Sequence, residues 1–485
     1  MANNANSVGS YLATRTKYDA LGRAVEVSNP TEIYGDGTPT GDDAAGYRWT
    51  KQAYDWKGRP TLTTFPAVAG QALGNTTELS YGGCGCAGGE VANYRDERGR
   101  RRKLYKDVPG RLVKVEEMNW LESQGIYSTT TYTYNARDQI TQINQQGQLR
   151  TMKYDGHGRL WKRTTPEQGL TTYSYNADDT VQSMTDARGV TTSYVYNSRH
   201  LVTNINYTIP ANSTVTPTSN VTFEYDAAGN RTARYNGVEL RQYHYDQLSR
   251  LDHEDIYFPS LNDTWRRISY EYNGAGQLQR LTNPWGVQVS YAYDANGRAS
   301  SVTGANYAGI GTYASNLRYR AFGGMKGLTY GNGKTLALNY DARVRLKTWD
   351  VAGVLRWNYR YDRFDENSHR VTYAQNIGSA SSTAGMPNPD PSLDRSYDYD
   401  QVGRLRYAHT GVEARMHAFN QANDGGAYGP YSQHAYYDVW GNRTQRLGWG
   451  GANPSETATY DAHNQRTGLS YDLSGNFISD GQAYS

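Results

Sequence analysis

The sequence predicts an all-β protein in which tandem β-hairpins follow one another as one continuous antiparallel ribbon. A Tyr-Asp or Tyr-Asn step recurs at Tyr154, Tyr175 and Tyr196, so that successive copies are 175 − 154 = 21 and 196 − 175 = 21 residues apart. A constant period of about 20 to 50 residues is the signature of a repeat architecture. Tyrosines also come in doublets two residues apart, as at Tyr173 and Tyr175. A period of two is typical of a β-strand, because alternate side chains point to the same face.

Each repeat is predicted to begin with a tight turn. In residues 154–159 (YDGHGR), Asp155 stands at the first position of a type I turn, where its carboxylate can accept hydrogen bonds from the N–H groups of the turn. Gly158 stands at the fourth position, where a left-handed φ is often required. A second turn falls about midway between the first ones, at 166–169 and again at 186–189. Each repeat is therefore expected to be a hairpin of two short strands.

The composition favours a thin, half-solvated sheet. The chain contains 44 Tyr and only 7 Phe, and its hydrophobic content is 37%. Its mean hydropathy is −0.82. Tyrosine can bury its ring while its hydroxyl stays in water, so it suits a sheet without a thick apolar core. Because strands twist, a sheet of this many strands is expected to curl into a spiral that forms part of a hollow shell.

One array is expected to fill the chain, residues 1–485, as a single domain. Turn motifs begin at Tyr18 and continue to Tyr471 without a change of pattern. Polar segments rich in Gly, Pro, Ser, Thr and Asp interrupt the array, and these are predicted to be loops or insertions. They lie at about 28–46, 66–90, 208–220, 376–392 and 419–432.

The motif residues are predicted to shape the turns and the sheet rather than to carry out chemistry. The Arg that follows Gly is expected to stack on a neighbouring tyrosine ring by a cation–π interaction. The residues that define this structural motif are Tyr18, Asp19, Gly22, Arg23, Tyr54, Asp55, Gly58, Arg59, Tyr154, Asp155, Gly158, Arg159, Tyr225, Asp226, Gly229, Tyr293, Asp294, Gly297, Arg298, Tyr399, Asp400, Gly403, Arg404, Tyr437, Asp438, Gly441, Tyr471, Asp472 and Gly475.

Charge and targeting signals argue against several classes of function. The 50 Lys and Arg against 47 Asp and Glu give a net charge of +3, and the charges are scattered over the turns. This distribution argues against a nucleic-acid partner. Residues 1–10 (MANNANSVGS) lack the basic-then-apolar pattern of a signal peptide, and no apolar run approaches the length of a membrane span.

Metal and redox chemistry has one candidate in the sequence, the pair Cys84 and Cys86. Thiolates at close spacing can bind soft metals, but structural zinc needs four ligands, and the chain has no second cysteine cluster. Two thiols in a Gly-rich turn are the favoured interpretation. The nine histidines are dispersed and form no HExxH spacing; among them are His157, His200, His244 and His253. They are expected to be solvated residues of turns and strands, so neither a metal nor a cofactor is expected.

Acid–base catalysis has a candidate in the adjacent carboxylates Asp178 and Asp179. A glycosidase needs two carboxyl groups about 5 to 10 Å apart around one bond, whereas adjacent turn residues tend to diverge. Capping of the turn explains the Asp in every copy without any reaction. No catalytic residue is expected.

The motif Y-D-x-x-G-R-L and its Y-D-x-x-G-N variants, at spacings near 20 residues, resemble the repeats of the RHS/YD-repeat family. The resemblance covers nearly the whole chain. The family includes bacterial rearrangement-hotspot proteins, wall-associated proteins, the B and C components of insecticidal toxin complexes, and the teneurins. The resemblance implies a β-hairpin ribbon that spirals into a large hollow shell, which in the bacterial proteins encloses a C-terminal toxin.

The chain departs from the toxin-carrying members of this family in one respect. Those members have a core-associated segment with an aspartate-based self-cleavage site near a DPxGL motif, followed by a variable tail. The nearest string here, residues 388–393 (NPDPSL), has Ser where Gly is expected, lacks one position and is interpreted as a turn. We therefore expect a stretch of shell wall without a C-terminal core or toxin domain. The remaining core and effector would lie on the same chain or on a neighbouring one.

The expected function is structural and non-catalytic. The chain would enclose or present a toxin or effector in bacterial delivery or contact-dependent competition, and the resemblance implies a secreted or cell-surface location. The alternative is a carbohydrate-binding or adhesion module of the cell surface. Its Tyr-rich sheet face would stack on sugar rings, and glycans would be its partners.

Overall fold

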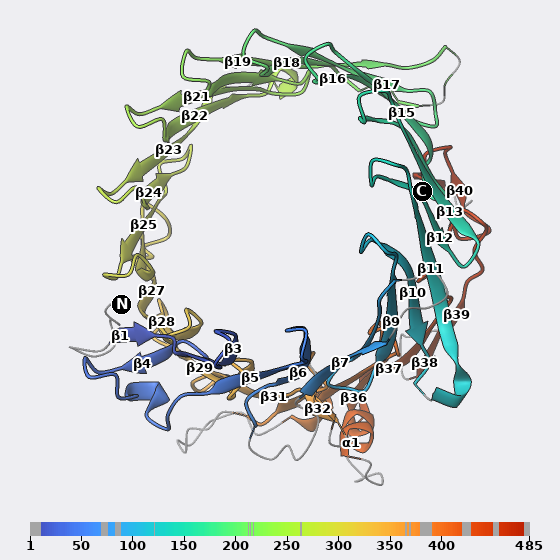
Figure 1. The fold of residues 1–485 in the computed structure, drawn as a ribbon. Coiled ribbons are helices and arrows are strands. Elements are labelled where there is room, and N and C mark those ends of the chain that lie inside the picture. The colour runs from blue at the N-terminus through green and yellow to red at the C-terminus, as the bar shows by residue number, and fades with distance from the viewer. Residues whose placement is uncertain are drawn as a thin grey trace. The chain divides into compact units, whose positions relative to one another are not determined.

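The computed structural model describes residues 11–68, 76–82, 89–120, 122–211, 213, 215–216, 218–261, 264–363, 366–367, 370–378, 390–419, 428–449 and 455–479 (Figure 1). Nearly all of its regular structure is β-strand. One long antiparallel sheet contains 35 strands, which pair in chain order from β2 to β39, and this sheet is not closed. The predicted all-β class and continuous antiparallel ribbon are confirmed.

The chain divides into two units by its internal contacts, and each is described by itself. The first unit consists of Met1–Thr130, Ala292–Thr303 and Thr312–Ala458, and the second of Thr131–Tyr291, Gly304–Gly311 and Thr459–Ser485.

The strands that lie wholly or mostly in the first unit are β1 (Tyr11–Ala13), β2 (Thr16–Tyr18), β3 (Ala24–Ser28), β4 (Thr31–Ile33), β5 (Trp49–Tyr54), β6 (Pro60–Thr64), β7 (Thr76–Gly82), β8 (Val91–Arg95), β9 (Arg101–Lys106), β10 (Leu112–Met118), β11 (Ile126–Tyr134), β26 (Ala299–Ala305), β27 (Thr312–Tyr319), β28 (Met325–Tyr330), β29 (Thr335–Tyr340), β30 (Leu346–Val351), β31 (Leu355–Arg360), β32 (Asp362–Arg363), β33 (Glu366–Asn367), β34 (Tyr373–Asn376), β35 (Arg395–Tyr399), β36 (Leu405–Gly411), β37 (Tyr428–Tyr437), β38 (Arg443–Trp449) and β39 (Glu456–Thr457). Its helices are the 3-10 turns η1 (Gly41–Asp43), η2 (Glu122–Gln124) and η4 (Pro391–Leu393) and the α-helix α1 (Val412–Phe419).

The strands of the second unit are β12 (Ile140–Gln145), β13 (Gln148–Tyr154), β14 (Leu160–Thr165), β15 (Gly169–Tyr175), β16 (Val181–Thr185), β17 (Thr191–Tyr196), β18 (Val202–Thr208), β19 (Val221–Tyr225), β20 (Arg231–Tyr235), β21 (Leu240–Tyr245), β22 (Leu251–Tyr257), β23 (Arg266–Tyr272), β24 (Leu278–Thr282), β25 (Gln288–Tyr293), β40 (Ser470–Tyr471) and β41 (Phe477–Ser479). A 3-10 turn, η3 (Pro259–Leu261), follows β22.

The register of each motif hairpin is set by its turn. In β15 and β16, Tyr175 pairs with Val181, whereas Ser174 pairs with Ser183, so the ladder shifts by one residue at the tyrosine. The same shift occurs at Tyr154 between β13 and β14. In these hairpins the residue before the motif tyrosine therefore faces the residue eight positions after that tyrosine.

The first unit contains several departures from the hairpin pattern. Strand β4, which lies inside the predicted insertion 28–46, pairs with β1 in a separate two-stranded sheet. Strand β7 lies inside the predicted insertion 66–90. The helix α1 packs against β35, β36 and β37, and its residues Val412 and Ala414 are fully buried. The helix therefore covers these three strands with a buried apolar contact.

Buried ion pairs join distant repeats within the first unit. Arg343 donates to Glu97 at 2.5 Å, and both side chains are almost completely buried. Arg98 donates to Asp398 at 3.0 Å. These pairs connect repeats that are hundreds of residues apart in the sequence.

Side chains of residues 459–476 contact the repeats of the second unit. Arg188 forms an ion pair with Asp472 at 3.2 Å. Gln148 and Asn464 donate to each other through their amides, each at 2.8 Å. Asn464 and Asp472 belong to late turns, so these turns are held against the regular block of hairpins.

Candidate functional site

The motif turn has one detailed geometry, which Asp155 illustrates. Its Oδ1 accepts hydrogen bonds from the N–H groups of His157 and Arg159, both at 2.9 Å, and its Oδ2 accepts one from Nε of Arg159 at 2.8 Å. The N–H of Gly158 donates to the Asp155 carbonyl at 3.0 Å, and Gly158 has φ 88°. Aspartate and glycine therefore take the places that the sequence predicts for them.

The other predicted Asp, Arg and Gly residues of the motif take the same places. The Asp carboxylate accepts from the guanidinium of the Arg four residues later in the turns at Asp19–Arg23, Asp55–Arg59, Asp294–Arg298 and Asp400–Arg404. Asn230, Asn442 and Asn476 replace this Arg in three turns, and the Nδ2 of each donates to Oδ2 of the Asp. The motif glycines all have positive φ: Gly22, Gly58, Gly158, Gly229, Gly297, Gly403, Gly441 and Gly475.

Neighbouring motif turns are joined by a recurring set of contacts, which we call the turn latch. The hydroxyl of Tyr175 donates to the carbonyl of Leu160, the residue that follows Arg159, at 2.7 Å. The guanidinium carbon of Arg159 lies 4.6 Å from the centroid of the Tyr175 ring. Nη1 of Arg159 also donates to the carbonyl of Asn176 at 3.3 Å. Each turn thus holds the next one through a hydroxyl, a ring and a guanidinium.

The latch recurs in both units. The predicted stacking of Arg on tyrosine is confirmed at Arg23 on Tyr54, Arg59 on Tyr81, Arg250 on Tyr272, Arg298 on Tyr319, Arg345 on Tyr361 and Arg404 on Tyr437. Tyrosine hydroxyls donate to the equivalent carbonyl at Tyr54, Tyr81, Tyr154, Tyr196, Tyr225, Tyr245, Tyr272, Tyr319, Tyr340, Tyr361 and Tyr437.

The latch changes the titration of its members. Burial raises the pKa of Asp155, but hydrogen bonds from the backbone and guanidinium of Arg159 outweigh it, so the pKa lies below its ordinary value. Burial raises the pKa of Tyr175, and it raises that of Tyr361 to about 12. The carboxylate therefore stays charged and the phenols stay neutral near pH 7.

The carboxylates considered for catalysis have separate partners. Oδ1 of Asp179 accepts from Nη1 of Arg159 at 2.6 Å. Asp178 accepts from the backbone N–H and hydroxyl of Thr180, and its Oδ2 lies 2.9 Å from Nδ1 of His200. Each carboxylate is thus part of the local turn structure. The thiol candidates, Cys84 and Cys86, lie outside the described residues.

A cavity of about 230 Å³ lies beside the turn at 96–100 in the first unit, and it is rich in arginine. Two of its guanidinium groups have carboxylate partners: Arg98 pairs with Asp398, and Arg100 donates to Asp96 at 2.5 Å. The arginines in its wall are Arg98, Arg100, Arg101, Arg102 and Arg370. The contacts of Arg98 and Arg100 therefore belong to the packing of this turn.

A group of polar side chains is buried around α1. His409 and Ser432 lie 2.5 Å apart between Nδ1 and Oγ, and Nδ1 of His417 on α1 lies 3.1 Å from Oγ of Ser396. Burial lowers the pKa of the nearby His434 to about 4. Sequence reasoning did not identify this group, because no motif links these residues. The contact between His417 and Ser396 joins the helix to β35, whereas the contact between His409 and Ser432 joins the neighbouring strands β36 and β37.

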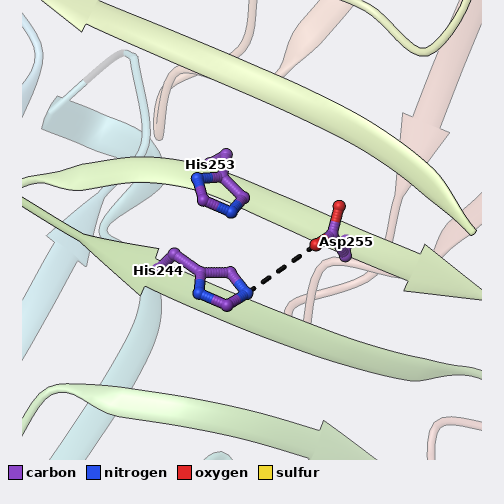
Figure 2. Close-up of side chains that lie close together, drawn as sticks. All are labelled: His244, His253 and Asp255. Atoms are coloured by element: carbon purple, nitrogen blue, oxygen red, sulfur yellow. Dashed lines mark ion pairs between the residues drawn. The ribbon is translucent and has the colours of Figure 1, made fainter.

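A third group, His244, His253 and Asp255, lies on the hairpin of β21 and β22 in the second unit, and its donor atoms lie within 4.8 Å of one another (Figure 2). Sequence reasoning treated these histidines as dispersed. The signal that could have found them is the hairpin register, because His244 precedes the motif tyrosine Tyr245 and His253 stands eight positions after it.

The part of the chain that the structure describes contains no helix with the length and apolar character of a membrane span.

Two family models match this sequence. The model described as Teneurin YD-shell matches residues 92–256, and the model described as RHS Repeat matches residues 269–308. No curated protein matches the chain.

Solved structures similar to the chain include parts of Tc toxins. The crystal structures of TcdB2-TccC3-Cdc42 and of TcdB2-TccC3 are similar with a TM-score of 0.75 at 14% and 15% identity, and the match covers 97% of this chain and 26% of those chains. The structure of the Photorhabdus luminescens Tc holotoxin pore is similar with a TM-score of 0.75 at 15% identity, and the match covers 97% of this chain and 26% of that chain. This chain thus spans about a quarter of the chains that it matches. These likenesses show the fold, and the two family models confirm that the repeats resemble those of the RHS/YD-repeat family.

Proposed function

We propose that the chain is a non-catalytic wall segment of a shell that encloses or presents a toxin or other effector. The observation that carries this proposal is the turn latch. It uses the Asp, Arg and Tyr of the motif to fasten each hairpin to its neighbour, through contacts such as Arg159 on Tyr175. Because these side chains hold neighbouring hairpins together, they build a continuous wall. Containment of an effector requires such a wall and requires no catalytic residue.

The partners proposed for this wall follow from its extent. Because the chain matches only 26% of the TcdB2-TccC3 chains, the remaining shell and the effector are proposed to lie on the same chain or on a neighbouring one. The setting would be bacterial delivery or contact-dependent competition, in secreted form or at the cell surface. The resemblance to the RHS/YD-repeat family supports this setting, because the bacterial members of that family enclose a toxin.

Protease protection tests the proposal. The chain is co-expressed with the coding segment that adjoins it in the genome, and that segment carries an epitope tag. We expect the tag to resist a protease when the chain is present and to be cut when it is absent. Equal cutting in both cases would contradict containment.

A pair of variants sharpens this test. Arg345→Ala removes a buried member of the latch, whereas Lys57→Ala removes an exposed cation of a turn. We expect the first variant to speed cleavage of the tag and the second to leave it unchanged. If the tag is cut at the same rate in the presence of either variant, its protection does not depend on the wall.

Glycan binding is the second proposal, and exposed indoles favour it. Trp56 is 87% exposed and Trp285 is 73% exposed, and both stand in turns. Exposed aromatic rings can stack on sugar rings. A glycan array with the intact chain, compared with Trp56→Ala/Trp285→Ala, tests this proposal. Absence of any bound glycan would remove it and would leave the shell proposal unaffected.

A further inference from the structure

Two histidines face each other across the hairpin of β21 and β22. His244 and His253 are register partners, and their rings stack with centroids 4.1 Å apart and an interplanar angle of 11° (Figure 2). His244 is exposed and His253 is half-buried. Partner residues in an antiparallel pair lie on the same face of the sheet, so both imidazoles are presented side by side.

Asp255 adds a carboxylate on that face. It lies two residues after His253, and alternate residues of a strand share a face. Its Oδ2 is 3.7 Å from Nε2 of His244, and the donor atoms of all three side chains lie within 4.8 Å of one another (Figure 2). Two imidazoles and one carboxylate therefore converge without any other element of the fold.

A fourth residue fixes the ring of His253. Oδ2 of Asp252 lies 2.6 Å from Nδ1 of His253. A carboxylate at this distance favours a proton on Nδ1, which leaves the lone pair on Nε2. Histidines that bind metals commonly donate their other N–H to a carboxylate in this way. Stacking of the two histidine rings does not require this contact between Asp252 and His253.

Arg267 is the cation that such a site must accommodate. Its Nε and Nη2 donate to the two oxygens of Asp255 at 2.9 and 2.8 Å, and its side chain is 58% exposed. An exposed guanidinium can turn toward water when a metal takes one of these oxygens.

We propose that His244, His253 and Asp255 form a binding site for a divalent transition-metal ion of the Zn²⁺ class. Asp252 acts as the positioning residue, and water completes the coordination. Imidazole nitrogen suits Zn²⁺, Cu²⁺ and Ni²⁺, whereas Mg²⁺ and Ca²⁺ prefer sites made of oxygen alone. Tetrahedral bonds of about 2.0 to 2.1 Å place ligand atoms roughly 3.3 Å apart, so the three side chains close on the ion by rotation.

Zn²⁺ titration of the full chain tests the site, in a background with Cys84→Ser and Cys86→Ser because free thiols would also bind Zn²⁺. Affinity is measured by competition with a chromophoric chelator. We expect one site that His244→Ala and His253→Ala each weaken by at least tenfold. The matched control His157→Ala removes an exposed turn histidine of the same unit and should leave the affinity unchanged.

Two further variants separate a metal site from a stacked histidine pair. Asp252→Asn should lower the Zn²⁺ affinity by about 10- to 100-fold, while Asp252→Glu should retain most of it. Arg267→Gln should raise the affinity, because the carboxylate of Asp255 no longer shares its oxygens with a cation. The same affinity in His244→Ala, His253→Ala and His157→Ala would overturn the proposal. Hydrogen exchange of β21 and β22 without metal verifies that each variant keeps the hairpin.

Discussion

Arg345→Ala tests whether the turn latch holds the wall together. Arg345 donates to Oδ2 of Asp341 from Nε at 2.7 Å, and its guanidinium lies 4.4 Å from the centroid of the Tyr361 ring. The side chains of Arg345 and Asp341 are only 8% and 5% exposed. The matched control is Arg23→Ala, which removes the same contacts from a pair whose side chains are 28% and 22% exposed.

The expected cost at Arg345 follows from its burial. A hydrogen bond to a charged group contributes about 1.5 to 3 kcal/mol. A desolvated cation–π contact adds about 1 to 2 kcal/mol. Their sum agrees with the roughly 3 to 5 kcal/mol that follows the removal of one partner from a buried ion pair. At Arg23, solvent screens the pair, so the control should be affected far less.

Hydrogen–deuterium exchange is the suitable assay, because repeat arrays open locally rather than as one unit. About 3 kcal/mol corresponds to a roughly hundredfold change in an equilibrium constant. Amides of β29, β30 and β31 should therefore exchange about a hundredfold faster in Arg345→Ala. Amides of β2, β3 and β5 should change only slightly in Arg23→Ala. Equal acceleration in both variants would refute the argument that buried latches support the wall.

Three further predictions concern the tyrosines, the turn backbone and pH. Tyr361→Phe should cost about 1 kcal/mol in local exchange because it removes one buried hydrogen bond, while Tyr18→Phe, at a 64% exposed ring, should cost nothing measurable. Val344 has φ 56° at the position where most motif turns carry glycine, so Val344→Gly should raise the melting temperature, whereas Gly110→Ala, at φ 92°, should lower it. Partial burial raises the pKa of several tyrosines from the ordinary 10 to about 12, so the stability that they contribute is complete below pH 10 and is lost as pH rises towards 12. Absorbance of tyrosinate followed together with circular dichroism should show this loss in one step, and ionisation without unfolding would contradict it. These tyrosines are Tyr105, Tyr270, Tyr361 and Tyr397.

The repeated turns could be predicted from the sequence because their contacts are local. Asp155 reaches Arg159 across only four residues, and Gly158 takes the left-handed φ that the turn needs. The same local chemistry places Tyr175 at the end of its strand, next to the turn that follows. The fold class and the latch residues were therefore accessible without coordinates.

The His244 group was accessible in principle and was missed for a specific reason. A search for metal sites by spacing looks for helical patterns such as HExxH, whereas these ligands lie across a hairpin. The register rule of the motif hairpin places His253 opposite His244, and alternation then adds Asp255. The spacing of nine residues from His244 to His253 predicts that the two face each other only when the register shift at Tyr245 is known.

The sequence by itself determined the hairpin, its turn and its period, since each depends on residues within one repeat of each other. Only the tertiary structure decided which distant turns meet. Glu97 belongs to the turn at 96–100, and nothing in the neighbouring sequence indicates that it forms a buried ion pair with Arg343, 246 residues away. The α-helix α1 likewise forms where the repeat pattern fails, and its place depends on packing against β35, β36 and β37. Such contacts depend on how far the sheet twists between one repeat and another, and this twist accumulates over many strands instead of being set by any one of them.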